Sequence, residues 1–173
     1  QALIQKLEQL RGSKLLAHLT SDRRSLAPVP GMATVFATEP QGLFADLLRP
    51  LGMGLPKLDL FLYTRGGDTN AVWPLVSLLR EHARELACLV PFRAHSAGTL
   101  FCLAADEIVM TERSELSPID PTTANQFNPS GAGGQPLGIS VEDVSAYMRF
   151  ARDDKKVGIQ SEQYILEVFK ELT

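Results

Sequence analysis

The stretch that decides the fold is VPFRAHSAGTLFCL, residues Val90–Leu103. Its first half alternates apolar side chains at Val90, Phe92 and Ala94, as a strand does, whereas its second half has the apolar spacing of a helix. Ser96 falls between the two halves. The sequence therefore predicts that Ser96 lies at a strand-to-helix corner.

A serine at such a corner has the surroundings that a nucleophile needs. Its hydroxyl is held out from the backbone, and the small residues Ala97 and Gly98 leave room for a substrate. The N-terminus of the following helix directs unpaired N–H groups toward an oxyanion formed nearby. We interpret Ser96 as a candidate nucleophile. The alternative is an N-cap serine without chemistry, because Ser is a favoured N-cap residue.

The composition is that of one globular domain with a sizeable core. The chain has 173 residues, of which 45% are hydrophobic and 21% charged. The formal net charge is −3, and no run of Lys or Arg forms a basic patch. Nucleic acid and an anionic membrane surface are therefore not expected as partners.

The two cysteines, Cys88 and Cys102, both lie in apolar stretches. This setting predicts reduced, buried thiols in place of a disulfide framework or a metal site. The carboxylates of Asp68, Asp106 and Glu107 are not spaced as a metal cluster. We expect no metal and no cofactor.

Apolar stretches are interrupted well before the ~20 residues that span a bilayer, and the N-terminal residues lack the form of a signal peptide. We expect a cytoplasmic protein that associates with a membrane only through segments outside this chain. The chain begins without Met and ends within a predicted helix, as a fragment of a longer protein would.

The periodicity of apolar residues alternates between strand and helix through the centre of the chain. This alternation is typical of an α/β fold with a parallel sheet and helical crossovers. The predicted strands are Met32–Thr38, Lys57–Thr64, Ala87–Ala94 and Glu107–Thr111. The predicted helices are Gln1–Leu19 (one or two, with a break at Gly12-Ser13), Gly42–Leu51, Thr69–Leu86, Ala97–Ala105, Ser140–Asp154 and Ser161–Leu172.

The sequence also predicts one helix face, one helix cap and one long loop. Leu43, Phe44, Leu47 and Leu48 are predicted to form the apolar face of the helix Gly42–Leu51. Ser140 is predicted to cap the helix that follows it. The stretch Arg113–Gly138, rich in proline and glycine, is predicted to be a long functional loop.

A second corner follows the strand Lys57–Thr64, at Gly66-Gly67. Open α/β sheets build their sites at the carboxyl ends of adjacent strands, so this corner and the Ser96 corner are expected to be neighbours. A Gly-Gly turn exposes a backbone N–H without a side chain in front of it. The Gly67 and Ala97 N–H groups are therefore predicted to bind an oxyanion together. The alternative is a tight turn with no chemistry.

Three motifs carry a family resemblance: YTRGGDT (Tyr63–Thr69), AHSAGTLFCLAADEIVM (Ala94–Met110) and SELSPIDP (Ser114–Pro121). In this order and spacing they resemble the serine dehydrogenase proteinase family, which is related to signal peptide peptidase A and the Clp protease proteolytic subunit. The resemblance is best over Met32–Pro121. It implies a single Clp/crotonase-like domain over residues 1–173, built of repeated ββα/βα units. The domain would comprise an N-terminal helical segment (1–25), a core (32–121) and C-terminal helices (140–173).

The resemblance also implies functional roles. It implies a serine peptidase that cleaves polypeptide through an acyl-enzyme on Ser96. Gly67 and Ala97 match the oxyanion-hole amides. Three residues are then expected to border the substrate groove: Gly66, Pro118 and Asp120.

The general base is where the sequence departs from the Clp subunit, which has a histidine just before a proline in the matching stretch. This chain has Ile119 and Asp120 at that place. We interpret Asp120 as a hydrogen-bond acceptor that fixes the loop and not as a base. The histidines are His18, His82 and His95. His95 adjoins the serine in an extended segment, so its side chain should point away from the serine hydroxyl, and no Ser-His-Asp triad is predicted.

Relatives of the signal peptide peptidase A type supply a lysine base later in the chain, where this sequence has Lys155 and Lys156. A lysine acts as a base only if burial or a nearby cation lowers its pKa. Asp153 and Asp154 oppose that, because neighbouring carboxylates favour the charged lysine. The alternatives are a solvated helix end, a base beyond residue 173, a base from another subunit, or no base at all.

Two functions outside peptidase chemistry stay open from the sequence alone. The missing histidine is consistent with an inactive Clp-fold module that binds a peptide or a partner. The paired amides are also consistent with a crotonase-like site for an acyl thioester.

A homo-oligomer is expected because residues 1–19 and 161–172 carry apolar faces that the predicted core does not need. Clp-fold peptidases commonly assemble in this way. The competing explanation is that both segments fold back onto their own core.

Overall fold

The computed structural model describes residues 2–20, 35–38, 40–123 and 137–153, with the single positions 128, 130 and 134. The chain forms two compact units, Gln1–Ile119 and Asp120–Thr173. None of the described helices has the length and apolar character needed to cross a membrane. A single domain over the whole chain stays a prediction.

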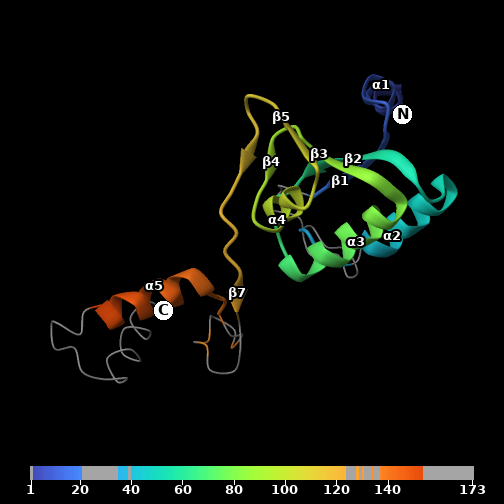
Figure 1. Ribbon diagram of the computed structural model, residues 1–173. Coiled ribbons are helices and arrows are strands. Elements are labelled where there is room, and N and C mark those ends of the chain that lie inside the picture. The colour runs from blue at the N-terminus through green and yellow to red at the C-terminus, as the bar shows by residue number, and fades with distance from the viewer. Residues whose placement is uncertain are drawn as a thin grey trace. The chain divides into compact units, whose positions relative to one another are not determined.

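The first unit is built on a four-stranded parallel sheet, as predicted (Figure 1). The order of the strands across the sheet is β1-β2-β3-β5. Leu16 lies opposite Leu60, which in turn lies opposite Cys88, so apolar residues from neighbouring strands fall into rows across one face. The strands are β1 (Lys14–Leu19), β2 (Leu55–Tyr63), β3 (Ala83–Val90) and β5 (Glu107–Met110).

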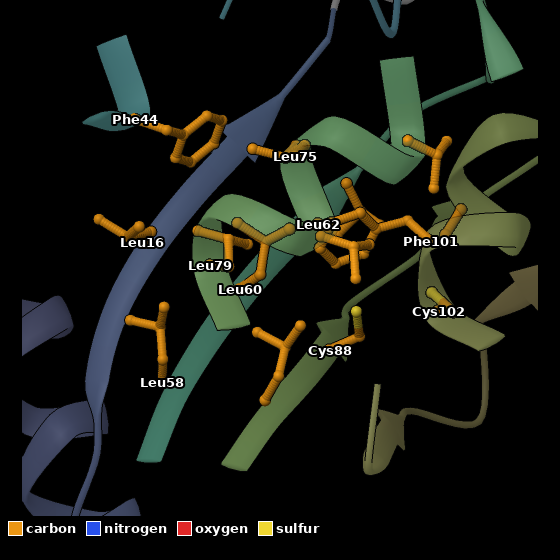
Figure 2. Packing of buried hydrophobic residues seen from close by; sticks show 14 of the residues in the cluster. Leu16, Phe44, Leu58, Leu60, Leu62, Leu75, Leu79, Cys88, Phe101 and Cys102 are labelled. Atoms are coloured by element: carbon orange, nitrogen blue, oxygen red, sulfur yellow. The ribbon is translucent and has the colours of Figure 1, made fainter. Parts of the chain in front are cut away.

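Three helices cover this face: α2 (Pro40–Leu48), α3 (Val72–His82) and α4 (Ala97–Leu103) (Figure 1). Figure 2 shows their side chains, among them Leu79 and Phe101, meeting the leucines of β2. Short 3₁₀ helices follow α2 at Arg49–Leu51 and precede α3 at Thr69–Ala71. This layer of apolar contact positions the carboxyl ends of the strands, where the sequence places the candidate site.

The predicted apolar face of α2 is only half correct. Phe44 and Leu48 are buried in the core, but Leu43 and Leu47 are 67% and 55% exposed. The helix is short and packs at one edge of the sheet, so it buries one row of side chains and leaves the adjacent row outside.

The prediction of helix throughout residues 1–19 is wrong for the second half of that segment. Helix α1 (Ala2–Arg11) ends before Gly12, whose φ of 62° is a left-handed conformation that stops the helix. Residues 14–19 then form the edge strand β1, which buries Leu15, Leu16 and His18. This segment is part of the sheet, contrary to the expectation that the core does not need it.

The helix predicted as Thr69–Leu86 ends at His82, and β3 starts four residues before the predicted strand. Ala83 and Leu86 fit the helical period, yet they pair with Leu55 and Leu58 of β2 and are buried there. Pairing with a neighbouring strand outweighs local periodicity at this boundary.

The predicted strand Ala87–Ala94 is interrupted at Pro91-Phe92. Its end, β4 (Arg93–Ala94), pairs instead with β6 (Glu115–Leu116) in a small second sheet. Within the predicted strand Met32–Thr38 the structure describes residues 35–38. Phe36 there forms a parallel bridge with Gly67.

The second unit contains the antiparallel pair β7 (Thr122–Thr123) and β8 (Ile139–Ser140), followed by α5 (Val141–Asp153). Ser140 caps α5, as predicted, because its Oγ accepts a hydrogen bond from the Asp143 N–H at 3.0 Å. The Ser140 hydroxyl donates to Asp120 Oδ1 at 2.9 Å, which confirms Asp120 as a loop-fixing acceptor. The predicted helix Ser161–Leu172 lies outside the described residues.

A partly buried ion pair links α1 to the sheet at the end away from the candidate site. The Asp59 side chain on β2 is fully buried and accepts hydrogen bonds from the Arg11 guanidinium and from Ser13 Oγ. Arg11 also donates to Glu107 Oε2 at 2.6 Å, which Lys57 Nζ approaches to 2.7 Å. The hydrogen bond to Asp59 raises the pKa of Arg11, whereas Lys57 and then Arg11 lower the pKa of Glu107.

Replacing Arg11 should destabilise this unit strongly. Arg11→Met leaves the Asp59 carboxylate buried without a cation, a change that costs about 3–5 kcal/mol of unfolding free energy. Urea denaturation at pH 7 measures it. Lys6→Met, which removes an exposed cation from the same helix, is the control and should change stability by less than about 0.5 kcal/mol. Arg11→Met/Asp59→Leu should recover most of the loss. Equal effects of Arg11→Met and Lys6→Met would contradict the account.

Candidate functional site

Ser96 lies at the predicted corner between β4 and α4, in an unusual backbone conformation. Its φ is 50° and its ψ is −112°, and among the described residues it is the one non-glycine residue with positive φ. Such strain costs about 1–3 kcal/mol and is found where a function needs it, as at the serine of a nucleophile elbow. Ser96 is the N-cap residue of α4, but its side chain makes no capping hydrogen bond.

The Gly66-Gly67 turn lies directly beside Ser96, as expected for corners of neighbouring strands. A Cβ atom on Gly66 would lie 2.7 Å from Ser96 Cβ and 3.3 Å from Ser96 Oγ. A Cβ atom on Gly67 would lie 2.1 Å from the Phe36 carbonyl oxygen. The φ angles of the two glycines, 102° and 149°, would also strain any other residue. Both positions therefore require glycine.

At the glycine corner, the N–H groups on either side of Gly67 are hydrogen-bonded. Gly66 N–H donates to Thr64 Oγ1 at 3.0 Å, and Asp68 N–H donates to the Phe36 carbonyl at 2.8 Å. The Gly67 N–H between them has no partner in the part of the chain that the structure describes. In the parallel bridge with Phe36, the hydrogen bonds use the Gly66 carbonyl and the Asp68 N–H. The N–H of Gly67 therefore points away from Phe36.

The serine corner shows the same pattern. Ser96 N–H donates to Ser117 Oγ at 2.7 Å, and Gly98 N–H donates to the His95 carbonyl at 2.8 Å. Ala97 N–H, at the start of α4, has no partner among the described residues. At each corner, the middle one of three successive N–H groups thus has no hydrogen-bond partner among the described residues. The Ser96 hydroxyl likewise bonds to no described residue.

The histidines do not supply a base to Ser96 within the described residues. His95 Nε2 lies 3.2 Å from Glu115 Oε2, so the ring is directed to that carboxylate, in agreement with the prediction. His82 Nδ1 lies 3.0 Å from the Leu78 carbonyl on its own helix. His18 is buried in β1, where burial lowers the pKa of its ring.

The remaining residues predicted for the site are only partly placed. Lys155 and Lys156 lie outside the described residues. Pro118 is exposed, and its carbonyl accepts the Ser117 hydroxyl at 2.9 Å. Asp120 belongs to the second unit, where it bonds to Ser140. That Pro118 and Asp120 border a groove stays a prediction.

Cys88 and Cys102 are both buried, as predicted. A hydrogen bond with Cys102, together with burial, raises the pKa of the Cys88 thiol. Over the described stretches, no cluster of three or more histidine, cysteine, aspartate or glutamate side chains forms a metal site.

Two residues that sequence reasoning did not single out contribute to the corners. Phe36 holds the glycine turn through its backbone, and Ser117 accepts the Ser96 N–H. Ser117 lies in the SPIDP motif, but the family resemblance assigned no role to this serine. The distance of 21 residues between Ser96 and Ser117 carries no local signal for their contact.

Comparison with known proteins identifies the family of the chain. Residues 40–133, more than half of the chain, match the family described as ClpP-like SDH-type serine proteinase. The chain belongs to this family. The resemblance drawn from the motifs and the α/β fold expected from it are thereby confirmed.

Two uncharacterized proteins of the archaeon Methanocaldococcus jannaschii are similar in sequence. One is 32% identical over 138 residues, which cover 70% of this chain and 46% of the relative. The other is 28% identical over 172 residues, which cover 97% of this chain and 57% of the relative. The chain thus spans about half the length of the curated relatives that it matches. No solved structure matches it significantly.

Replacing Gly67 tests the geometry of the glycine corner in this family member. Gly67→Ala should lower the free energy of unfolding by about 2–4 kcal/mol, since the new methyl group meets the Phe36 carbonyl and the backbone is strained. The matched control is Gly54→Ala, because Gly54 has a positive φ of 76° but open space around it. That control should cost only about 1 kcal/mol in urea denaturation. If both variants lose the same stability, Phe36 does not crowd Gly67.

Proposed function

We propose that the protein is a serine peptidase that cleaves polypeptide through an acyl-enzyme on Ser96. One observation carries the proposal: two free backbone N–H groups, of Gly67 and Ala97, accompany a strained serine whose hydroxyl has no described partner. Membership of a serine proteinase family supports it.

The proposed reaction begins with attack of Ser96 Oγ on the carbonyl carbon of a peptide bond. The carbonyl oxygen becomes an oxyanion, and the Gly67 and Ala97 N–H groups donate hydrogen bonds to it. A general base accepts the Ser96 proton and gives it to the leaving amine as the tetrahedral intermediate collapses, which leaves an ester on Ser96. Water then hydrolyses the ester and restores the serine hydroxyl. Removing one donor of such an oxyanion hole typically costs about 10²–10³ in kcat.

Labelling with a fluorophosphonate probe tests the nucleophile. The intact protein should be labelled on one serine, and Ser96→Ala should abolish labelling, because the probe reacts with an activated serine hydroxyl. Mass spectrometry of the labelled peptide identifies the residue. Ser77→Ala, which removes a hydroxyl from α3, is the control and should label as the wild type does. Full labelling of Ser96→Ala would overturn the proposal.

The general base is proposed to be Lys155 or Lys156, in a Ser-Lys dyad. For either lysine to accept the Ser96 proton, its surroundings must lower its pKa despite the neighbouring Asp153 and Asp154. Such a dyad would remove the need for a histidine at the serine.

Separate replacement of the two lysines tests the dyad. Lys155→Met or Lys156→Met should lower peptide turnover by about 10²–10⁴, the usual contribution of a general base, and the other variant should stay close to the wild-type rate. Lys6→Met is the control for loss of a surface cation. Wild-type turnover in both variants would contradict the Ser-Lys dyad.

A second function, an inactive module that binds a peptide or a partner protein, is favoured by one observation. Ser96 Oγ contacts no acid–base group among the described residues. This proposal predicts peptide binding without labelling or turnover in the wild-type protein. Labelling at Ser96 decides against it.

We also propose that the protein is a homo-oligomer. Helix α1 carries no buried residue, and its Leu3 and Leu10 are 79% and 74% exposed. Exposed apolar side chains of this kind are typical of a subunit contact. The predicted contribution of residues 161–172 lies outside the described residues.

A further inference from the structure

We propose that Ser117 is a positioning residue, which holds the Ser96 peptide in its strained conformation and so aims the Ser96 hydroxyl and the Ala97 N–H at one substrate carbonyl. This inference rests on the proposed peptidase function. It assigns to Ser117 a role that acts through Ser96 and not through contact with the substrate.

The hydrogen bond between the two serines has a defined direction. Ser117 Oγ donates its proton to the Pro118 carbonyl at 2.9 Å. With its proton placed there, the oxygen presents a lone pair to the Ser96 N–H, which lies 2.7 Å away. The φ angle of Ser96 relates its N–H to its Cβ. Holding the N–H restrains the peptide plane before Ser96 and so helps to keep the Cα–Cβ bond, which carries the hydroxyl, in its direction.

Ser117 is itself held by a buried hydroxyl. Its N–H donates to Thr99 Oγ1 at 3.0 Å, and the Thr99 hydroxyl donates to the Ala94 carbonyl at 2.6 Å. Thr99 is buried in the first turn of α4, and Ala94 ends β4. The hydrogen bonds thus close a circuit from Ala94 through Thr99 and Ser117 to Ser96. The circuit joins three segments of the chain around the corner.

The circuit also determines which N–H faces the substrate. Since the Ser96 N–H is bonded to Ser117, it is withdrawn from the oxyanion, and the direction of the Ala97 N–H follows from the ψ of −112° at Ser96. Without the acceptor on Ser117, a return of Ser96 to negative φ is opposed by fewer hydrogen bonds: those of Gly98 N–H to the His95 carbonyl and of Leu100 N–H to the Ser96 carbonyl remain. That relaxation would rotate both the hydroxyl and the Ala97 N–H away from a common target.

The test compares Ser117→Ala, which removes the acceptor, with Ser117→Thr, which keeps a hydroxyl. At saturating fluorophosphonate, Ser117→Ala should be labelled about 10- to 100-fold more slowly, because misplaced reacting groups lose rate, with an unchanged half-saturating probe concentration. Ser117→Thr should restore the rate to within about threefold of the wild type. Ser117→Cys, whose sulfur accepts hydrogen bonds only weakly, is the second loss variant if Ser117→Ala does not fold.

Amide hydrogen exchange of Ser96, followed by NMR, is the second readout and does not depend on catalysis. The Ser96 N–H should be protected in the wild type and in Ser117→Thr, and should exchange rapidly in the loss variant. A wild-type labelling rate, or undiminished protection of the Ser96 N–H, in the loss variant would overturn the role of Ser117. Labelling of Ser117→Thr as slow as that of Ser117→Ala would also overturn it. If the wild type is not labelled at all, the peptidase proposal fails, and the exchange rates alone decide whether Ser117 holds Ser96.

Discussion

The described site is arranged around two backbone N–H groups, those of Gly67 and Ala97, which have no hydrogen-bond partner among the described residues. Folded proteins bond nearly all of their buried polar groups, so the N–H groups on both sides of each position are satisfied within the chain. The hydroxyls of Thr64 and Ser117 and the carbonyls of Phe36 and His95 accept them. The Gly67 and Ala97 N–H groups near Ser96 are thus the unpaired donors at the two corners, among the described residues.

The sheet supplies the rigidity that keeps the two corners together. The end of β2 pairs with β4 through a bridge between Thr64 and Ala94, in which Thr64 N–H donates to the Arg93 carbonyl at 2.9 Å. Helix α4 then packs closely on β2, since a Cβ atom on Gly98 would lie 2.4 Å from Thr64 Cγ2. The glycine of the Ser-Ala-Gly motif is therefore required for packing, while the serine has the strained backbone.

The sequence allowed prediction of those features that depend on residues close together in the chain. The two corners could be found because Gly66-Gly67 and Ser96 each follow a short apolar run, and the cap at Ser140 has a local signature. Strand β1 was predicted as helix because its character depends on pairing with β2, more than 40 residues away. The contact between Ser96 and Ser117 is likewise a product of the folded topology.

We propose that the Gly67 and Ala97 N–H groups bind the oxyanion formed at Ser96. A crystal structure of the protein after reaction with a fluorophosphonate tests it most directly, because the phosphonyl oxygen takes the place of the oxyanion. We expect phosphorus bonded to Ser96 Oγ, with the phosphonyl oxygen about 2.7–3.1 Å from the Gly67 and Ala97 nitrogen atoms. An adduct on another residue, or a phosphonyl oxygen directed away from these two N–H groups, would contradict it.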